Sequence, residues 1–397
     1  MNTKKLNKIK IFLLCLLVGG VFAACGGGGG GGSGSSVSAG QGTLATSLTD
    51  ASSDAYRAIY VTIAEVQVHP DSGGGWQIVA SPNKTYNLLD LVNGVRESLG
   101  IATLDAGHYS QMRLILGETP DAEINLLSQP HPYANYLIDE NDAVHELKVS
   151  SGLTTGLKIV NGFDIDADQT TELVLDFDAM RSVVKAGASG KYLLKPTVKV
   201  RNTTDGAVVS GVVSKAAGAP VTFLGGAFVT AQIASSASAD AKDQVVIDGG
   251  TLSAADGGYS LFLAPGDYTL VATRDGYLPA CTAVSLQPDS RTTADFALTP
   301  VPENGTGELT GTVSIAGASA DQVVTVDFRQ EVTCDGASTT TLITVASVNV
   351  ANGGGFDVTL PVGDYQVVAY TAGQTTLVLD NVTVTSGVMN NLGVFSF

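Results

Sequence analysis

Three aspartates come closest to a recognisable chemistry in this sequence. Asp164, Asp166 and Asp168 occupy alternate positions, and carboxylate oxygens spaced in this way can supply ligands to calcium. The segment departs from the helix–loop–helix calcium site, because Gln169 stands where glycine is needed and Leu175 where the bidentate glutamate belongs. The alternative, which we favour, is a strand end with its aspartates in solvent and the intervening apolar residues facing inward. Calcium is the one cofactor that the sequence suggests.

The other side chains that commonly do chemistry form no catalytic motif. None of the four histidines stands in a His-Glu-x-x-His or His-x-x-Glu pattern, so the ligand spacing of a zinc peptidase is absent. There is no Gly-x-Ser-x-Gly nucleophile elbow. There is also no phosphate-binding loop, because serines follow the glycine tract at 26–32. We therefore predict no catalytic residues and no enzymatic activity.

The first 24 residues predict export. Four lysines precede an apolar run from Ile11 to Ala24, which ends in small residues. This order of charged, apolar and small residues is typical of a secretory signal. The apolar run has 14 residues, whereas a helix that spans a membrane needs about 20. We therefore expect a signal peptide over residues 1–24 rather than a retained membrane helix.

The end of this signal, Phe22-Ala23-Ala24-Cys25, resembles the lipobox of bacterial lipoproteins. The resemblance implies cleavage before Cys25, a lipid thioether on its sulfur and acylation of the new amino terminus by chains such as palmitate. Phe22 departs from the usual leucine. An ordinary secretory cut that leaves Cys25 as a free thiol is the alternative. Because Gly26 is not the aspartate of the inner-membrane retention signal, we expect an envelope protein anchored in the outer membrane of a Gram-negative bacterium.

Residues 25–40 form a glycine- and serine-rich tether after the lipidated cysteine. Seven consecutive glycines begin at Gly26, and such a run behaves as a flexible coil with a typical reach of roughly 20 Å over 15 residues. Cleavage of the signal would remove four lysines and shift the net charge from −17 to about −21. A chain this acidic is a poor partner for nucleic acid. Beyond the membrane, we expect polysaccharide or envelope proteins as partners.

The rest of the chain is expected to be all-β, with three tandem sandwich-like domains. Charged residues are only 15% of the sequence, and no segment shows sustained helical periodicity. In the first region, 41–203, apolar residues alternate along 56–69, with a change of phase that predicts a bulge near Ala64-Glu65. Residues 88–99 could hold one short helix. Further strands are expected at 42–48, 76–80, 109–116, 144–149, 156–163, 170–177 and 192–200.

Two regions resemble known families. The first carries Ser47-Leu48-Thr49-Asp50-Ala51, Leu88-Leu89-Asp90-Leu91 and Asp176-Phe177-Asp178-Ala179, and resembles a domain-of-unknown-function family of bacterial envelope lipoproteins. The second, 207–299, carries Asp256-Gly257-Gly258-Tyr259 and Leu263-Ala264-Pro265-Gly266-Asp267-Tyr268. It resembles the carboxypeptidase regulatory-like domain, a small transthyretin-like β-sandwich. That fold is grouped with starch-binding-like modules, which adds carbohydrate binding by analogy.

The third region, 308–397, repeats the second in divergent form. Gly311-Thr312-Val313-Ser314 follows Gly211-Val212-Val213-Ser214 at an offset of 100, and Leu360 to Tyr365 follows Leu263 to Tyr268 at 97. Cys281 and Cys334 fall in different regions. The sequence leaves open whether they form a disulfide or are two buried free thiols.

A Leu-x-x-Gly-x-Tyr pattern occurs once in each region and ends at Tyr109, Tyr268 and Tyr365. A strand is expected to begin after each of these tyrosines. The position fits a structural tyrosine corner, in which the hydroxyl bonds to the backbone upstream at the edge of a sandwich. The alternative is an exposed ring that stacks on a sugar. We favour the corner.

The sequence thus favours a membrane-anchored envelope lipoprotein that acts as a non-enzymatic interaction or spacer module. A carbohydrate-binding surface lipoprotein is one alternative, although the chain has a single tryptophan, Trp76. An uncharacterised enzyme in the first region is another, and it would require side chains such as Asp50, Asp54, His69 and Asp178 to converge. The ligand, the oligomeric state and the side of the membrane that the protein faces stay open.

Overall fold

The computed structural model describes residues 40–397, except for 52–55, 93–94, 150–155, 160–161, 187–190, 204–205, 217–219 and 319–321. The chain divides into two units, Met1–Ser38 and Ala39–Phe397, and every described residue belongs to the second. The predicted signal peptide, Cys25 and most of the tether lie outside the described residues. No described helix is long and apolar enough to cross a bilayer.

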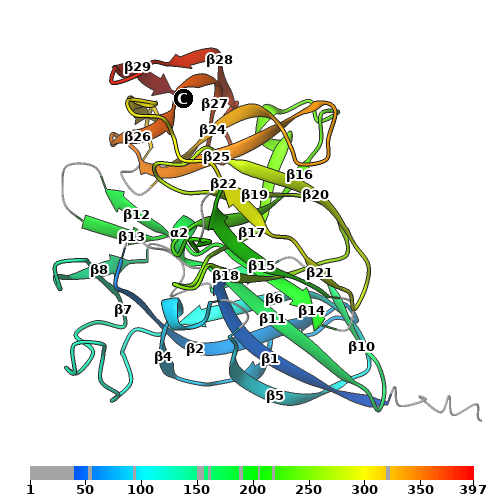
Figure 1. The fold of residues 1–397 in the computed structure, drawn as a ribbon. Coiled ribbons are helices and arrows are strands. Elements are labelled where there is room, and N and C mark those ends of the chain that lie inside the picture. The colour runs from blue at the N-terminus through cyan, green and yellow to red at the C-terminus, as the bar shows by residue number, and fades with distance from the viewer. Residues whose placement is uncertain are drawn as a thin grey trace, which may run out of the picture. The chain divides into compact units, whose positions relative to one another are not determined.

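The prediction of an all-β protein is confirmed. Strands make up most of the regular structure of the described chain (Figure 1), and they form six sheets. Three large apolar clusters lie between these sheets, and each draws its residues from one of the three regions. Each region therefore has a core of its own, as a sandwich domain requires.

The first region contains a four-stranded sheet in the order β14-β11-β1-β5 and a second sheet whose main path is β10-β6-β2-β7-β8-β13-β12. Strand β2 is buried along both faces. Ile59, Val61 and Ile63 enter the large core, whereas Ala58 and Tyr60 pack into a smaller cluster. The elements are β1 (Gln41–Ala51), β2 (Ala58–Pro70), β3 (Gln77–Ala80), β4 (Lys84–Asn87), η1 (Leu88–Asp90), β5 (Glu97–Asp105), β6 (Gly107–Leu116), β7 (Asn135–Ile138), β8 (Val144–Lys148), β9 (Leu157–Ile159), β10 (Phe163–Ile165), β11 (Thr170–Asp178), α2 (Ala179–Ser182), β12 (Val183–Ala186), β13 (Lys191–Leu194) and β14 (Val198–Asn202).

Local predictions in this region succeed in part. The register of β2 against β6 shifts between Ile63 and Glu65, so the predicted bulge is confirmed. The helix considered for residues 88–99 is wrong beyond a single turn of 3₁₀ helix at η1. From Glu97 the chain runs as β5, because it pairs along β1 and buries Leu99 and Leu104 in the core.

The second and third regions share one strand order. The second has sheets β18-β15-β21, with β22 also on β15, and β17-β16-β19-β20. The third has β26-β23-β29 and β25-β24-β27-β28, so the repeat seen in the sequence extends to the topology. The strands of the second region are β15 (Ala207–Lys215), β16 (Phe228–Ala234), β17 (Val245–Leu252), β18 (Gly258–Leu263), β19 (Gly266–Thr273), β20 (Ala280–Leu286), β21 (Arg291–Thr293) and β22 (Phe296–Leu298), with η4 (Ala241–Asp243) before β17. Those of the third are β23 (Thr306–Ser314), β24 (Val323–Thr333), β25 (Thr340–Ala351), β26 (Gly355–Pro361), β27 (Gly363–Tyr370), β28 (Leu377–Val384) and β29 (Met389–Ser396).

Candidate functional site

The three aspartates considered for calcium lie at the end of β10 and in the turn after it. Asp164 is on β10, and its Oδ1 atom lies 2.9 Å from Nδ1 of His108. Asp166 and Asp168 are exposed, and Asp168 adopts a left-handed turn conformation with φ of 59°. Asp164 and Asp166 line an open cavity of about 770 Å³.

This aspartate segment follows the strand-end pattern only in its first half. Phe163 and Ile165 are buried, but Ala167, expected to face inward, is exposed. Among the described residues, no group of three or more His, Cys, Asp or Glu side chains is close enough to hold a metal ion. The calcium site stays a prediction.

The three tyrosines of the repeated pattern make one common contact. Each hydroxyl donates to the carbonyl four residues upstream: Tyr109 to Asp105 at 3.0 Å, Tyr268 to Ala264 at 3.1 Å and Tyr365 at 2.8 Å to Pro361. All three side chains are buried, and burial raises the pKa of Tyr268 to about 12. Rings held in this way present no open face to a sugar.

A network of charged side chains joins the first region to the second. Lys199 and Arg201, on β14, meet Asp248 on β17. Lys199 Nζ lies 2.8 Å from Oδ1 of Asp248, and Arg201 Nη1 donates to Oδ2 at 2.9 Å. Arg201 also lies 3.4 Å from Asp176 Oδ2 on β11. Its side chain is only 6% exposed, so this interface holds ionised groups away from water.

The environment of this network shifts several pKa values. Burial raises the pKa of Asp176, although Arg201 opposes the shift. Burial also raises the pKa of Asp178 to about 6 against the opposing charge of Arg181. Burial alone would raise the pKa of Asp248 too, but Arg201 and Lys199 outweigh it and lower the value to about 2. Asp248 therefore stays ionised as the acceptor that both cations share.

The Asp248 contact predicts a specific pH dependence. Because the folded-state pKa of Asp248 is below its unfolded value, its stabilisation is present above pH ~4 and is lost as the pH falls toward 2. Asp178 acts oppositely, since its raised pKa makes the folded state less stable as the pH rises from ~4 to ~6. Replacing Asp248 with Asn should therefore lower the free energy of unfolding by about 2 kcal/mol near pH 7, and this deficit should shrink toward pH 2. Thermal melts from pH 7 to 2 would measure it.

The matched control is Asp267→Asn, at an exposed carboxylate on β19. It should change the melting temperature little at any pH. A deficit for Asp248→Asn that stays constant from pH 4 to pH 2 would contradict the assignment.

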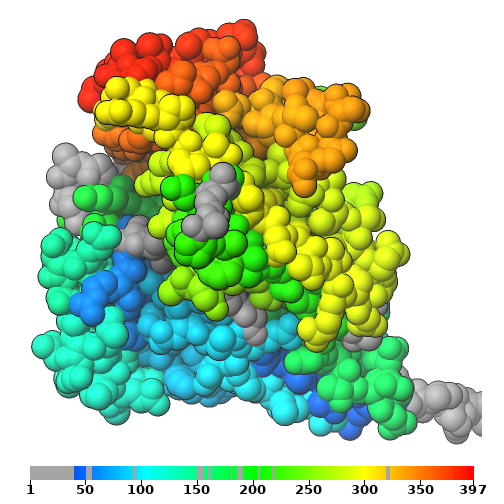
Figure 2. All heavy atoms as spheres, in the orientation of Figure 1, coloured from blue at the N-terminus to red at the C-terminus, as the bar shows by residue number. Residues whose placement is uncertain are grey.

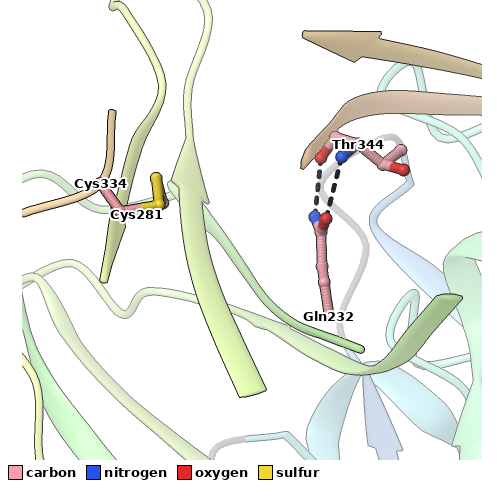
Figure 3. The surroundings of a disulfide bond; sticks show 4 residues. All are labelled: Gln232, Cys281, Cys334 and Thr344. Carbon is pink, nitrogen blue, oxygen red and sulfur yellow. Dashed lines mark hydrogen bonds between the residues drawn. A yellow bond between two sulfur atoms is a disulfide. The ribbon is translucent and has the colours of Figure 1, made fainter. Parts of the chain in front are cut away.

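A disulfide and a pair of hydrogen bonds join the second region to the third. Cys281 on β20 is bonded to Cys334, just after β24 (Figure 3). The side chain of Gln232 on β16 donates to the carbonyl of Thr344 at 2.7 Å and accepts from its amide at 2.8 Å. The side-chain amide of Gln232 thus bonds to the backbone of Thr344 as a neighbouring strand would. Of the two possibilities that the sequence left open for Cys281 and Cys334, the structure has the disulfide.

Arg329 on β24 extends this second interface into the interior. Its side chain is fully buried, and its guanidinium donates to the carbonyls of Ala241, Lys242 and Val245 at 2.6, 3.3 and 3.2 Å. It also lies 3.1 Å from Oδ2 of Asp327. The guanidinium of a third-region residue thus supplies the hydrogen bonds that water would otherwise donate to these carbonyls of the second region.

The first and third regions also touch. The side-chain amide of Asn349 donates to the carbonyl of Arg181 at 2.6 Å. Val184 and Leu193 of the first region form an apolar cluster with Val323 and Ala351 of the third. Every pair among the three regions is therefore linked by polar contacts, and the second and third regions are also joined by a disulfide.

The side chains named for a catalytic alternative have structural contacts. Asp50 accepts from the amide of Ala179 at 2.9 Å, and Asp178 accepts from the amide of Arg181 at 2.9 Å. The ring of His69 packs against Trp76, with centroids 5.4 Å apart. Asp54 lies outside the described residues. Two of these groups thus cap the short helix α2, and the third belongs to an aromatic contact.

The interface residues were not identified from the sequence. Asp176 and Asp178 belong to the motif of the family resemblance, and Asp178 is also one of the side chains of the catalytic alternative. The sequence motifs include none of Lys199, Arg201, Asp248 and Arg329. One signal was available. Lys199 and Arg201 stand two residues apart on a strand, and this spacing places both cations on one face of the sheet. Such a pair is notable in a chain with only 21 basic residues.

Comparison with family models confirms both resemblances. Residues 41–196 match the model described as a domain of unknown function, DUF4382. Residues 208–299 match the carboxypeptidase regulatory-like domain. No curated protein matches the chain.

Comparison with solved structures finds weak likenesses. The Bacillus anthracis TIE protein is 12% identical with a TM-score of 0.21, over 90% of this chain and 50% of that one. The present chain thus spans about half of that protein. The shaft pilin SpaA of Lactobacillus rhamnosus GG is 12% identical with a TM-score of 0.20, over 48% of this chain and 97% of the pilin. Likenesses this weak carry no argument about function.

Proposed function

We propose that this protein is a lipid-anchored lipoprotein of the cell envelope whose three β regions act together as a non-enzymatic interaction or spacer module. The observation that carries the proposal is the cross-linking of the regions by the Cys281–Cys334 disulfide, the charged network around Asp248 and the buried Arg329. A block joined in this way can hold a binding surface at a fixed geometry. A string of independent domains cannot.

The disulfide also supports export. Disulfides persist in oxidising compartments and are rare in the cytosol of most organisms. A bond between Cys281 and Cys334 therefore agrees with the secretory signal and with a mature protein outside the cytoplasm. A lipid on Cys25 would then keep it at a membrane, since two or more acyl chains give stable anchoring.

A non-catalytic role is favoured by how the charged groups are used. Asp176, Asp248, Lys199 and Arg201 contact one another across an interface, and Asp50 and Asp178 bond to backbone amides. Catalysis would require some of these groups to face a substrate. The two families matched by the chain are a domain of unknown function and a regulatory-like domain.

Replacing Cys25 with Ser tests the anchor. The variant should lose its acyl mass and move from the membrane fraction to the soluble fraction, because no other lipid attachment is proposed. Mass spectrometry of the purified chain and fractionation of cells would measure both. The matched control is Cys15→Ser, within the apolar part of the signal, which should leave lipidation intact. A Cys25→Ser variant that stays in the membrane fraction would refute the anchor.

The interaction role is tested by binding of the full-length protein, in detergent, to polysaccharides and peptidoglycan with and without calcium. We expect that any binding persists without calcium and persists in the Trp76→Ala variant. A calcium-dependent interaction would instead assign a function to Asp164, Asp166 and Asp168, and dependence on Trp76 would favour the carbohydrate-binding alternative.

A further inference from the structure

The third region has an unusual distribution of charge. From Thr306 to Phe397 the sequence has eight acidic residues and one basic residue, Arg329. Arg329 is fully buried at the interface with the second region. Every exposed charged side chain described in this region is therefore acidic, as with Asp357, Asp364 and Asp380.

This region also ends in two edge strands. Strand β29 pairs with β23, and β28 pairs with β27. In the part of the chain that the structure describes, no other strand pairs with either of them. Both strands carry the C-terminal colours at the surface of the space-filling view (Figure 2). An edge of this kind presents backbone N–H and C=O groups that another strand can pair with.

The β29 edge lacks two of the usual protections, a lysine and a proline, although a register shift interrupts it near Gly393. Soluble proteins commonly guard such edges with lysine or proline, and β29 has neither. Its exposed apolar side chains are large: Met389 is 62% exposed and Val394 61%, and Val388 just before the strand is 47% exposed. A shift of register between Thr310 and Thr312 on β23 interrupts the pairing near Gly393, and Gly393 and Val394 are consecutive exposed residues. The edge thus combines free backbone and exposed apolar side chains, in a region whose exposed charged side chains are all acidic.

We propose that the β29 edge is a docking site for an extended, basic polypeptide segment of another envelope protein, which adds as a further strand. Backbone pairing would supply affinity, and contacts with Met389 and Val394 would select apolar side chains at alternate positions. Lysine or arginine in the segment would meet the acidic surface of the third region. This inference rests on the interaction role proposed above and names the surface and the class of partner.

The charge of the region argues against a second copy of the chain as the occupant. Two third regions placed edge to edge would bring acidic surfaces together, and like charges oppose association. A basic partner gains from the same surface. The binding should therefore weaken as the salt concentration rises, since exposed charges more than about 10 Å apart are screened at 0.1 M.

The test measures binding of a fluorescently labelled octapeptide to the full-length protein in detergent by fluorescence anisotropy. In this peptide, lysine alternates with valine and threonine. The edge variant Met389→Lys/Val394→Lys should weaken binding by about tenfold or more, which corresponds to about 1.4 kcal/mol. The matched control is Ile78→Lys/Ile101→Lys. It adds the same charge at residues of the first region that are 57% and 71% exposed, and it should change binding less than about twofold. Melting temperatures check that both variants fold.

Two further peptides separate strand addition from simple attraction of charge. The same peptide with N-methyl groups on alternate residues cannot form the ladder and should bind about tenfold more weakly. A peptide with glutamate in place of lysine should not bind. Equal weakening by the edge and control variants, equal binding of the N-methylated peptide, or no binding of the lysine peptide at 1 mM (roughly −4 kcal/mol) would each overturn the proposal. The interaction role is tested separately by binding to polysaccharides and peptidoglycan, so failure of that role and failure of the docking site can be told apart.

Discussion

Replacing Arg329 with Met should lower the free energy of unfolding by about 3–5 kcal/mol, the range for breaking a buried ion pair. The side chain is fully buried, and it donates to carbonyls of the second region as well as pairing with Asp327. Without it, Asp327 keeps a buried charge with one partner fewer, and the carbonyls lose donors that water cannot replace. Urea unfolding followed by circular dichroism would measure the shift in midpoint.

The control for this prediction is Arg291→Met, at an exposed arginine on β21. It removes the same charge and should change the midpoint little. Equal losses for the two variants would mean that the Arg329 contacts contribute no more than a surface charge. A separate early transition of the third region is also expected in the Arg329 variant, because the variant loses the Arg329 hydrogen bonds to the second region.

Removing the disulfide with Cys281→Ala/Cys334→Ala should cost about 4 kcal/mol, because the bond closes a loop between residues 53 apart and so restricts the unfolded chain. The same loss should appear when a reductant is added to the unmodified protein. Differential scanning calorimetry with and without dithiothreitol would compare the two.

The double alanine variant supplies its own control, since a reductant should not shift its melting temperature further. If the reductant lowers the stability of both proteins alike, the effect does not come from this bond. If neither the variant nor the reductant lowers stability, the packing of Val271 and Ile343 around the two cysteines is sufficient to hold the regions together.

A strand could be predicted from the sequence where the apolar pattern of its own residues is clear. Alternation along β2 predicted both the strand and its bulge, because Ile59, Val61 and Ile63, which enter the large core, stand at every second position. The strand β5 was not predictable in the same way. Its exposed and buried residues alternate loosely, with Ile101 in solvent, and it becomes a strand because β1 pairs with it.

The contacts between regions were beyond the sequence for a related reason. Asp248 and Arg201 are 47 residues apart, and Arg329 reaches Ala241 across 88. No local period connects such positions. In the sequence, each of these residues is only a charged side chain in a strand. Such side chains are mostly exposed, so nothing marks these as buried at an interface. The tyrosines at the start of β6, β19 and β27 differ, because their partner lies four residues away and the repeated pattern specifies it.

The disulfide also has a mechanical consequence. A protein anchored at one end, as proposed for this one, experiences force when a bound partner is pulled. The loop closed by Cys281 and Cys334 contains β21, β22, β23 and β24. Under tension these strands could peel from their sheets, but the chain between the two cysteines could not lengthen. At about 3.5 Å per extended residue, the 53-residue separation would otherwise release roughly 180 Å of slack. The bond therefore limits how far the molecule can be stretched before the covalent chain itself carries the tension.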